Sequence, residues 1–163
     1  LVVLDPVRGS SSGREPLDED GVTTLRERLL PLVDWVTPNI DELEILSGRR
    51  VTKRGDLPDA ARELQGEFAG LNVFATGGHL ESPDDFLLTA EGETWWLPGA
   101  RVDSTSTHGT GCALSSALLS GLVQGKSAYE AAVSAKIYVA QAIRTAVGLG
   151  HGRGPLNHLW PLG

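Results

Sequence analysis

The sequence contains no methionine and only one cysteine, Cys112, among 163 residues. A single cysteine excludes an internal disulfide and a cysteine-rich zinc cluster. No apolar run approaches the length of a bilayer span, and no signal peptide opens the chain, so we expect no membrane partner. Positive charge is also scarce, because 14 Lys and Arg stand against 21 Asp and Glu, for a net charge of −7. This balance argues against a general nucleic-acid binder and predicts that any phosphate is bound locally.

The residues that are present favour one ordered domain with many tight turns. Hydrophobic residues make up 40% and charged residues 21%, beside 20 glycines and 9 prolines. Short apolar runs alternate with helical periodicity, which is typical of a mostly parallel sheet with crossover helices. We therefore expect a soluble, cytoplasmic α/β protein. Because the chain opens directly on an apolar strand, Leu1 to Leu4, we also expect it to be a piece of a longer protein.

Turn and cap residues locate the elements. Asn39 is suited to cap a short helix that Gly48 ends, and Glu91-Gly92 is suited to a hairpin turn. Neither an internal repeat nor a domain boundary is evident. We expect strands at 1–4, 35–37, 71–75, 86–89 and 94–97, and helices over 18–30, 41–46, 56–68, 111–123 and 128–146.

The strongest local signal is the string Thr107-His108-Gly109-Thr110-Gly111-Cys112, which directly precedes an apolar helix. Glycines there permit left-handed dihedrals, so that successive amide N–H groups can point to one place. The start of the following helix adds unpaired donors and the positive end of its dipole. The string predicts an anion site, and Cys112 would lie in the first helical turn, where its thiol pKa falls. A glycine-rich helix start with a small buried cysteine explains the string equally well.

A zinc pair of His108 and Cys112 is disfavoured. The two residues are four positions apart, but two ligands are too few for a structural zinc site, and the glycines place His108 before the helix.

Acidic and amide side chains follow the predicted strand ends. Asp5 ends the first strand, and Asn39 and Glu42 follow the second. Open α/β sheets place their ligand crevice at this edge, and oxygen ligands of this kind hold Mg²⁺, usually together with water and substrate phosphates. Taken singly, each residue is better explained by a turn before proline or by a helix cap.

Two further glycine-rich segments follow the ends of predicted elements. Thr76-Gly77-Gly78-His79 follows a strand and could approach nucleotide phosphates, although a plain strand-exit turn explains it equally well. The segment from Gly148 to Pro155 follows a helix and lacks the P-loop pattern, so a P-loop enzyme is disfavoured. Trp95-Trp96 is best read as packing at a sheet edge.

Together these segments resemble the hydroxymethylpyrimidine/phosphomethylpyrimidine kinases of thiamine biosynthesis, which belong to the ribokinase-like superfamily. The resemblance spans nearly the whole chain, and Thr107 to Cys112 is its most specific part. Most sugar kinases of the superfamily carry Asp where this chain has Cys112, so the cysteine favours the pyrimidine or pyridoxal branch. The matching segments, in order, are Asp5-Pro6-Val7 with Ser10 to Gly13, Thr37-Pro38-Asn39 with Glu42, Gly77-Gly78-His79, Thr107 to Cys112, and Gly150 to Pro155 with Asn157-His158.

The resemblance implies a role for each matched position. Cys112 would be the general base or would polarise the acceptor oxygen, beside an anion hole for the transferring phosphoryl group. Asp5 and Glu42 would position Mg²⁺. The cofactor ATP would be approached by the turn after the third strand and bordered by the segment before the anion hole. The anion-hole residues are Gly109, Thr110 and Gly111, and the ATP-binding residues are Asn39, Thr76, Gly78, Asp103, Thr105, Thr107 and His108.

Two departures from the family pattern stand out. Family members commonly carry Lys where this chain has Thr76, and Arg8, Arg14 or Arg101 would have to replace that charge. The family's N-terminal segment, with most of the pyrimidine pocket, has no counterpart here. We therefore expect residues 1–163 to be the C-terminal nucleotide-binding and phosphoryl-transfer part of a single ribokinase-like domain, a mostly parallel sheet flanked by helices with an edge β-hairpin. An open apolar sheet edge would favour a homodimer.

The resemblance implies an ATP-dependent kinase that phosphorylates 4-amino-5-hydroxymethyl-2-methylpyrimidine and then its monophosphate to the pyrophosphate. The partner would be this small-molecule substrate, with no nucleic acid and no membrane. Two alternatives stay open. One is a pyridoxal-type kinase of the same fold, and the other is a non-catalytic regulatory relative that binds a pyrimidine or nucleotide.

Overall fold

The computed structural model describes residues 1–7, 18–78, 80–81, 83–148 and 151–162. The chain divides into two compact units, Leu1–Ala100 and Arg101–Gly163, and each is described by itself. Arg8, Arg14, Ser10 to Gly13, His79 and Gly150, which the sequence analysis singled out, lie outside the described residues.

The first unit contains a five-stranded sheet with the strands in chain order. β1 pairs in parallel with β2, and β2 pairs in parallel with β3, while β3, β4 and β5 are antiparallel neighbours. Gly92 takes a φ of +84° between the last two strands, as a tight hairpin requires. The expected parallel strands and the edge hairpin are confirmed. The strands are β1 Val3–Leu4, β2 Trp35–Val36, β3 Asn72–Ala75, β4 Asp85–Leu88 and β5 Thr94–Leu97.

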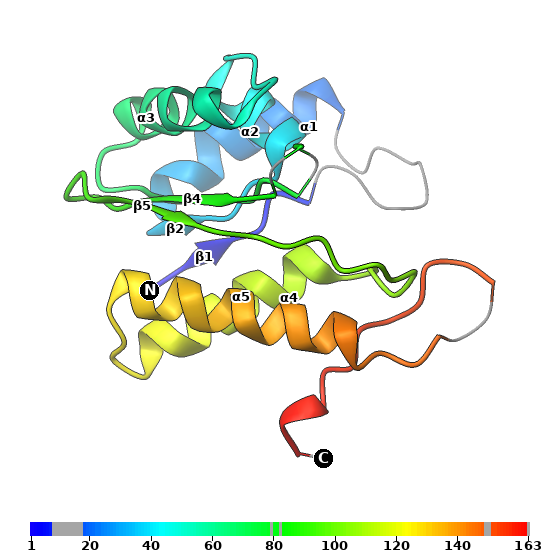
Figure 1. Ribbon diagram of the computed structural model, residues 1–163. Coiled ribbons are helices and arrows are strands. Elements are labelled where there is room, and N and C mark those ends of the chain that lie inside the picture. The colour runs from blue at the N-terminus through cyan, green and yellow to red at the C-terminus, as the bar shows by residue number, and fades with distance from the viewer. Residues whose placement is uncertain (8–17, 79, 82, 149–150, 163) are drawn as a thin grey trace. The chain divides into compact units, whose positions relative to one another are not determined.

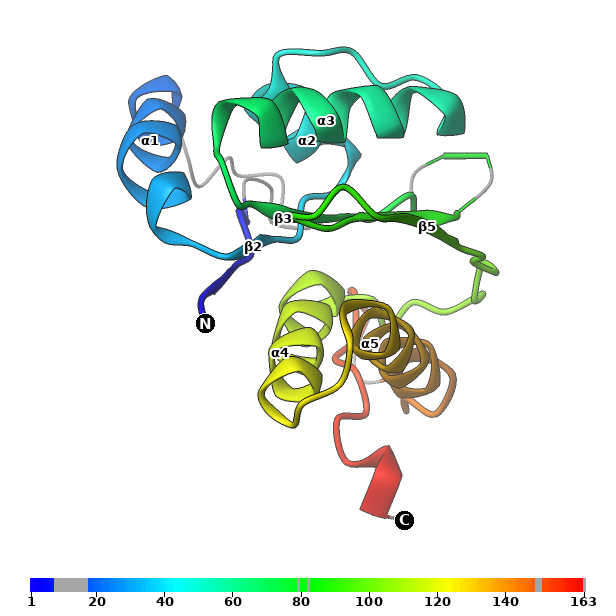
Figure 2. The same ribbon diagram turned by 90° about the vertical axis from the view of Figure 1, so that its left-hand side faces the viewer.

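Two helices of this unit, α2 (Ile40–Ser47) and α3 (Leu57–Glu67), cover one face of the sheet (Figures 1 and 2). Their apolar sides meet the strands in a core whose central side chains are almost fully inaccessible to solvent. These side chains include Leu43, Leu57, Leu64, Val36, Val73 and Leu88. The sheet and its crossover helices therefore match the predicted α/β class.

The helix expected from Asp18 begins where predicted but ends differently. Asp18 accepts a hydrogen bond from Gly21 N–H at 2.8 Å and caps α1, Glu19–Thr24. The chain then continues as a π-turn over Leu25–Leu29 and a 3-10 turn over Leu30–Leu32. Pro31 lies inside this last turn, and because proline has no N–H, it cannot support a further turn of α-helix.

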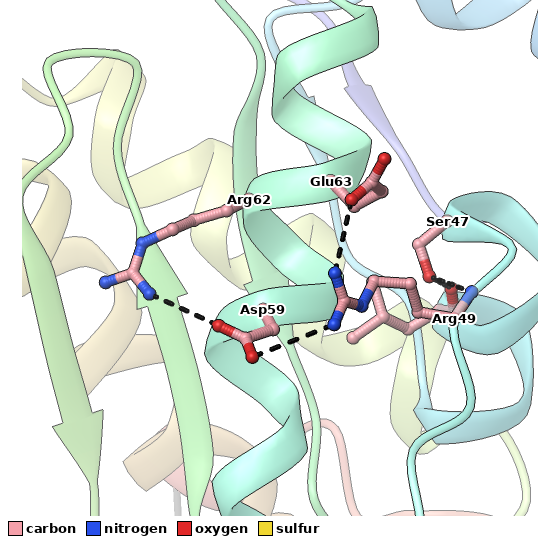
Figure 3. A network of polar contacts seen from close by, with 6 residues as sticks. Ser47, Arg49, Asp59, Arg62 and Glu63 are labelled. Carbon is pink, nitrogen blue, oxygen red and sulfur yellow. Dashed lines mark hydrogen bonds and ion pairs between the residues drawn. The ribbon is translucent and has the colours of Figure 1, made fainter.

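An arginine ties the end of α2 to the exposed side of α3 (Figure 3). Arg49 reaches Glu63 at 3.3 Å and Asp59 at 3.8 Å, and its backbone N–H donates to the Ser47 hydroxyl at 3.2 Å. Arg62 reaches Asp59 at 3.8 Å from its own helix. These side chains are about half exposed, so water and salt screen the pairs and each contributes little to stability.

The second unit is built on two helices, α4 (Thr110–Val123) and α5 (Ala128–Arg144). They pack closely, because a Cβ placed on Gly121 would lie 3.1 Å from the Cβ of Ala131. Ala131, Ala132 and Ala135 of α5 are fully buried. After α5 the chain turns back along it, where Asn157 N–H donates to the Ala142 carbonyl at 3.0 Å and Trp160 Nε1–H to the Tyr138 carbonyl at 3.1 Å.

Among the described residues, no helix is long and apolar enough to cross a lipid bilayer.

Candidate functional site

In the first unit, the carboxyl ends of the three parallel strands lie at one edge of the sheet. Asp5 directly follows β1 and is half-buried. Thr37 directly follows β2, and its backbone N–H donates to the Leu4 carbonyl at 3.0 Å. This hydrogen bond continues the parallel pairing of β1 and β2 to the ends of both strands. Asp5 therefore stands at the edge where parallel sheets hold ligands, as the sequence predicts.

Asn39 and Glu42 form a capping box at the start of α2. The Asn39 side chain accepts from Glu42 N–H at 3.0 Å, and the Glu42 carboxylate accepts from Asn39 N–H at 2.9 Å. Glu42 is only 5% exposed. The cap that the sequence offered as the plain explanation is confirmed. It also fixes a buried carboxylate beside the end of β2.

The turn after β3 joins the same edge. Thr76 pairs with Asn39 as a parallel bridge, and Thr76 N–H donates to the Pro38 carbonyl at 2.9 Å. Gly77 is buried and Gly78 is exposed. The structure thus brings together Asn39, Glu42 and Thr76, three of the predicted site residues, through backbone contacts between neighbouring strand ends.

In the second unit, α4 starts without a side-chain cap. Its N-cap residue is Gly109, with a φ of +85° in the left-handed region that the sequence predicts. By contrast, Asp18, Asn39 and Ser127 cap α1, α2 and α5 with side-chain oxygens. The first N–H groups of a helix have no partners within it, so an uncapped start can offer them to an anion.

Cys112 lies in the first turn of α4 and its side chain is exposed. The predicted position is confirmed, and the alternative of a buried cysteine is wrong. A groove of about 780 Å³ begins at Gly109 and Cys112 and continues between α4 and α5 past Ser116 and Tyr138. This volume is in the range of small-molecule sites.

The segment before α4 is held by the chain that follows α5. His108 N–H donates to the Gly154 carbonyl at 3.2 Å, Gly154 N–H donates to the Thr105 carbonyl at 3.1 Å, and His108 pairs with Pro155 as a parallel bridge. Asp103, Thr105 and His108 are exposed, and Thr107 is half-buried.

Sequence reasoning did not predict this pairing. A Cβ on Gly154 would lie 2.7 Å from the Ser106 hydroxyl, and Ser106 is only 2% exposed. Glycine is therefore required at this position because the two segments approach closely there. The glycine-rich run around Gly154 was the sequence signal that could have predicted this approach.

No group of three or more His, Cys, Asp and Glu side chains that could hold a metal ion occurs within the described ranges. Glu42 and Asp5 supply carboxylate oxygens, which suit Mg²⁺, an ion that commonly uses one or two carboxylates and completes its shell with water and phosphate.

Known proteins that are similar to this chain include members of the family that its motifs resemble. Residues 1–157 match the family model described as phosphomethylpyrimidine kinase. The chain is 42% identical over 161 residues to a hydroxymethylpyrimidine/phosphomethylpyrimidine kinase of Streptomyces coelicolor, covering 99% of this chain and 60% of that protein. It is 40% identical over 160 residues to a thiamine biosynthesis bifunctional protein of Geobacter sulfurreducens, covering 98% of this chain and 32% of that protein.

Among solved structures, the chain is similar to a Bacillus subtilis pyridoxal kinase determined as an ADP complex. The two share 31% identity and a TM-score of 0.83, over 99% of this chain and 60% of that one. The chain therefore spans between 32% and 60% of the length of these relatives.

Proposed function

We propose, because the chain belongs to the phosphomethylpyrimidine kinase family, that it phosphorylates 4-amino-5-hydroxymethyl-2-methylpyrimidine and then its monophosphate, with ATP as donor. The observation that carries the proposal is the uncapped start of α4, where Gly109 is left-handed and Cys112 is exposed in the first turn. Phosphoryl transfer needs positioning and charge neutralisation more than covalent chemistry, and a helix start of this kind offers both.

In the first transfer, the acceptor hydroxyl oxygen bonds to the γ-phosphorus of ATP as the bond from that phosphorus to the ADP oxygen breaks. The hydroxyl proton passes to Cys112 as thiolate, and ADP leaves with the bridging oxygen. In the second transfer, a phosphate oxygen of the monophosphate is the nucleophile. Backbone N–H groups of Gly109, Thr110 and Gly111 would stabilise the charge on the transferring phosphoryl oxygens.

The carboxylates proposed to hold Mg²⁺ are Asp5 and Glu42. Their chemistry fits the ion, since both are oxygen ligands at the carboxyl edge of the parallel strands and Glu42 is fixed by the capping box. The ion would neutralise phosphate charge. On the protein side, Asn39 holds Glu42 in place, so that the carboxylate does not have to be ordered when nucleotide binds.

The ATP-binding residues proposed in the first unit are Asn39, Thr76 and Gly78, and those in the second unit are Asp103, Thr105, Thr107 and His108. Support comes from their placement, at a strand edge in one unit and in a largely exposed segment held by Gly154 in the other. Thr76 provides no charge, so we expect weaker phosphate attraction at this turn than a lysine would give.

We also propose that residues 1–163 correspond to the nucleotide-binding and phosphoryl-transfer part of a single ribokinase-like domain, that the protein is cytoplasmic, and that it forms a homodimer. The 60% coverage of the Streptomyces relative supports the first of these. A pyridoxal-type kinase remains the second candidate, because the Bacillus structure similar to this chain is a pyridoxal kinase.

The test is acceptor-dependent ADP formation by the chain with MgATP and each pyrimidine acceptor, with pyridoxal as competitor. Cys112→Ala should lower kcat by at least about a hundredfold, because a general base contributes that much, while MgATP binding survives. Val123→Ala is the control, because Val123 is an exposed residue of the same helix outside the lining of the groove, and it should leave turnover unchanged. Preference for pyridoxal would assign the second candidate, and MgATP binding without turnover in the unsubstituted chain would indicate a regulatory relative.

A further inference from the structure

Asp84 and Asp85, which lie beyond the turn after β3 in the sequence, hold that turn in place. Gly77 lies directly against the backbone of Asp84, because a Cβ on Gly77 would overlap the Asp84 carbonyl oxygen. Gly77 N–H also donates to the Asp85 carboxylate at 3.0 Å, and Asp85 is only 7% exposed. The position of this turn therefore depends on where Asp84 and Asp85 are placed.

Asp84 is fixed in turn by two further contacts. Its carboxylate accepts from Gly99 N–H at 3.0 Å and pairs with Arg54 Nε at 2.8 Å. The Asp84 side chain is 16% exposed, so this ion pair is better shielded from water than those along α3. Asp84 thus joins the chain after β5 to the turn after β3.

Arg54 approaches from the short turn before α3. Its guanidinium carbon stands 3.8 Å from the centre of the Trp96 ring, and Trp96 packs on Phe86 with ring centres 4.9 Å apart. Stacking on an aromatic ring restricts a guanidinium to one plane, which costs little further entropy when it binds a carboxylate. Arg54 therefore connects Trp96 to Asp84.

We propose that Arg54 and Asp84 are positioning residues for the ATP-phosphate turn, Thr76 to Gly78. The inference rests on the proposed function, which assigns this turn to ATP. Neither residue would touch the phosphates. Arg54 orients Asp84, and the Asp84 backbone sets the depth of Gly77. Thr76 N–H and Gly77 N–H already donate to the Pro38 carbonyl and the Asp85 carboxylate, so the turn would meet a phosphate through Gly78 N–H. Holding Gly77 in place compensates for the missing charge at Thr76, because the next amide is then ordered before the anion binds.

The variants separate positioning from general stability. Arg54→Ala removes both the ion pair and the stack, Arg54→Lys keeps the charge without the planar stack, and Asp84→Asn keeps an acceptor for Gly99 N–H without the charge. Arg62→Ala is the matched control. Arg62 is an exposed arginine on α3 that pairs with Asp59 in the network of Figure 3.

The first measurement is MgATP affinity by calorimetry. We expect Arg54→Ala to weaken binding about tenfold, equivalent to about 1.4 kcal/mol. Arg54→Lys and Asp84→Asn should give intermediate losses, and Arg62→Ala should give none. Because Arg54 acts through Asp84, the double variant Arg54→Ala/Asp84→Asn should bind MgATP no more weakly than Arg54→Ala alone.

The second measurement is amide hydrogen exchange in the same proteins without nucleotide. In Arg54→Ala, exchange should quicken at Gly77 and Gly99 and stay unchanged in β1 and β2. Unchanged MgATP affinity in a variant with this local loosening would overturn the inference and leave the proposed function standing. Loosening throughout the sheet would overturn it in favour of a purely structural role. Failure of the unsubstituted chain to bind MgATP would overturn the proposed function itself.

Discussion

At the scale of single residues, two adjacent glycines of one turn have different reasons to be glycine. Gly77 is buried against the Asp84 backbone, whereas a Cβ on Gly78 would meet nothing within 4 Å. Neither has a φ in the left-handed region, so space alone distinguishes them.

Gly77→Ala should therefore destabilise the first unit by about 1–3 kcal/mol, because the methyl group forces backbone apart and cannot be accommodated by a side-chain rotation. Gly78→Ala is the control and should change stability by less than about 0.5 kcal/mol. Urea unfolding of both variants measures the difference. Equal stability in the two variants would mean that the turn and the start of β4 can separate without cost.

Residue types that act through local geometry were predictable from the sequence. Asn39 as a cap, Gly48 as a helix end and Gly109 as a left-handed residue are all confirmed, because each depends on a few neighbouring residues. Arg54 with Asp84 and Ser106 with Gly154 were not predictable. Those pairs are 30 or more residues apart in the sequence, and only the folded backbone brings them together.

At the scale of elements, the helices of the second unit start in opposite ways. α4 begins with a glycine and no side-chain cap, whereas Ser127 and Glu130 close a full capping box on α5. α5 is thus stabilised at its start by side-chain caps, whereas the cap residue of α4 contributes no side-chain acceptor.

The capping box makes the stability of α5 depend on pH. Hydrogen bonds from the Ser127 hydroxyl and then the Ser127 amide lower the pKa of Glu130 from its usual 4.5. A lowered pKa in the folded state means that this carboxylate stabilises the fold above the unfolded value and loses that effect as pH falls through the folded value.

Glu130→Gln should therefore be less stable than the unsubstituted chain at neutral pH, and the difference should shrink below about pH 4.5 and vanish in stronger acid. Ser127→Ala should cost about 1 kcal/mol, as loss of an N-cap usually does. Circular dichroism during urea unfolding at several pH values measures both. A difference independent of pH would show that the carboxylate charge contributes nothing.

Element boundaries were predictable where caps and glycines mark them, and less so where helix types mix. The start of α1 at Asp18 was read correctly, but the π-turn over Leu25–Leu29 has no simple sequence signal. π-turns are rare and depart from the ordinary helical spacing, so periodicity alone does not predict one.

At the scale of the whole molecule, charge sets what the protein can bind. With a net charge of −7, the chain repels polyanions at long range, so phosphate recognition depends on local donors. We expect the Kd for duplex DNA to exceed about 10⁻⁴ M at physiological salt, which is weaker than the binding of ordinary non-specific DNA-binding proteins. Fluorescence anisotropy of a labelled duplex tests this. Tighter binding that weakens steeply with salt would reveal a basic surface that the overall charge conceals.

The one cysteine of this acidic chain also makes it a convenient subject for chemistry. Because Cys112 is the sole thiol and is exposed, a maleimide dye or an alkylating reagent attaches at a single known position. The mass of the intact protein then shows directly what fraction of the molecules carries the label, without digestion. Every labelled molecule carries its probe at the first turn of α4, so the label reports on the proposed phosphoryl-transfer site itself.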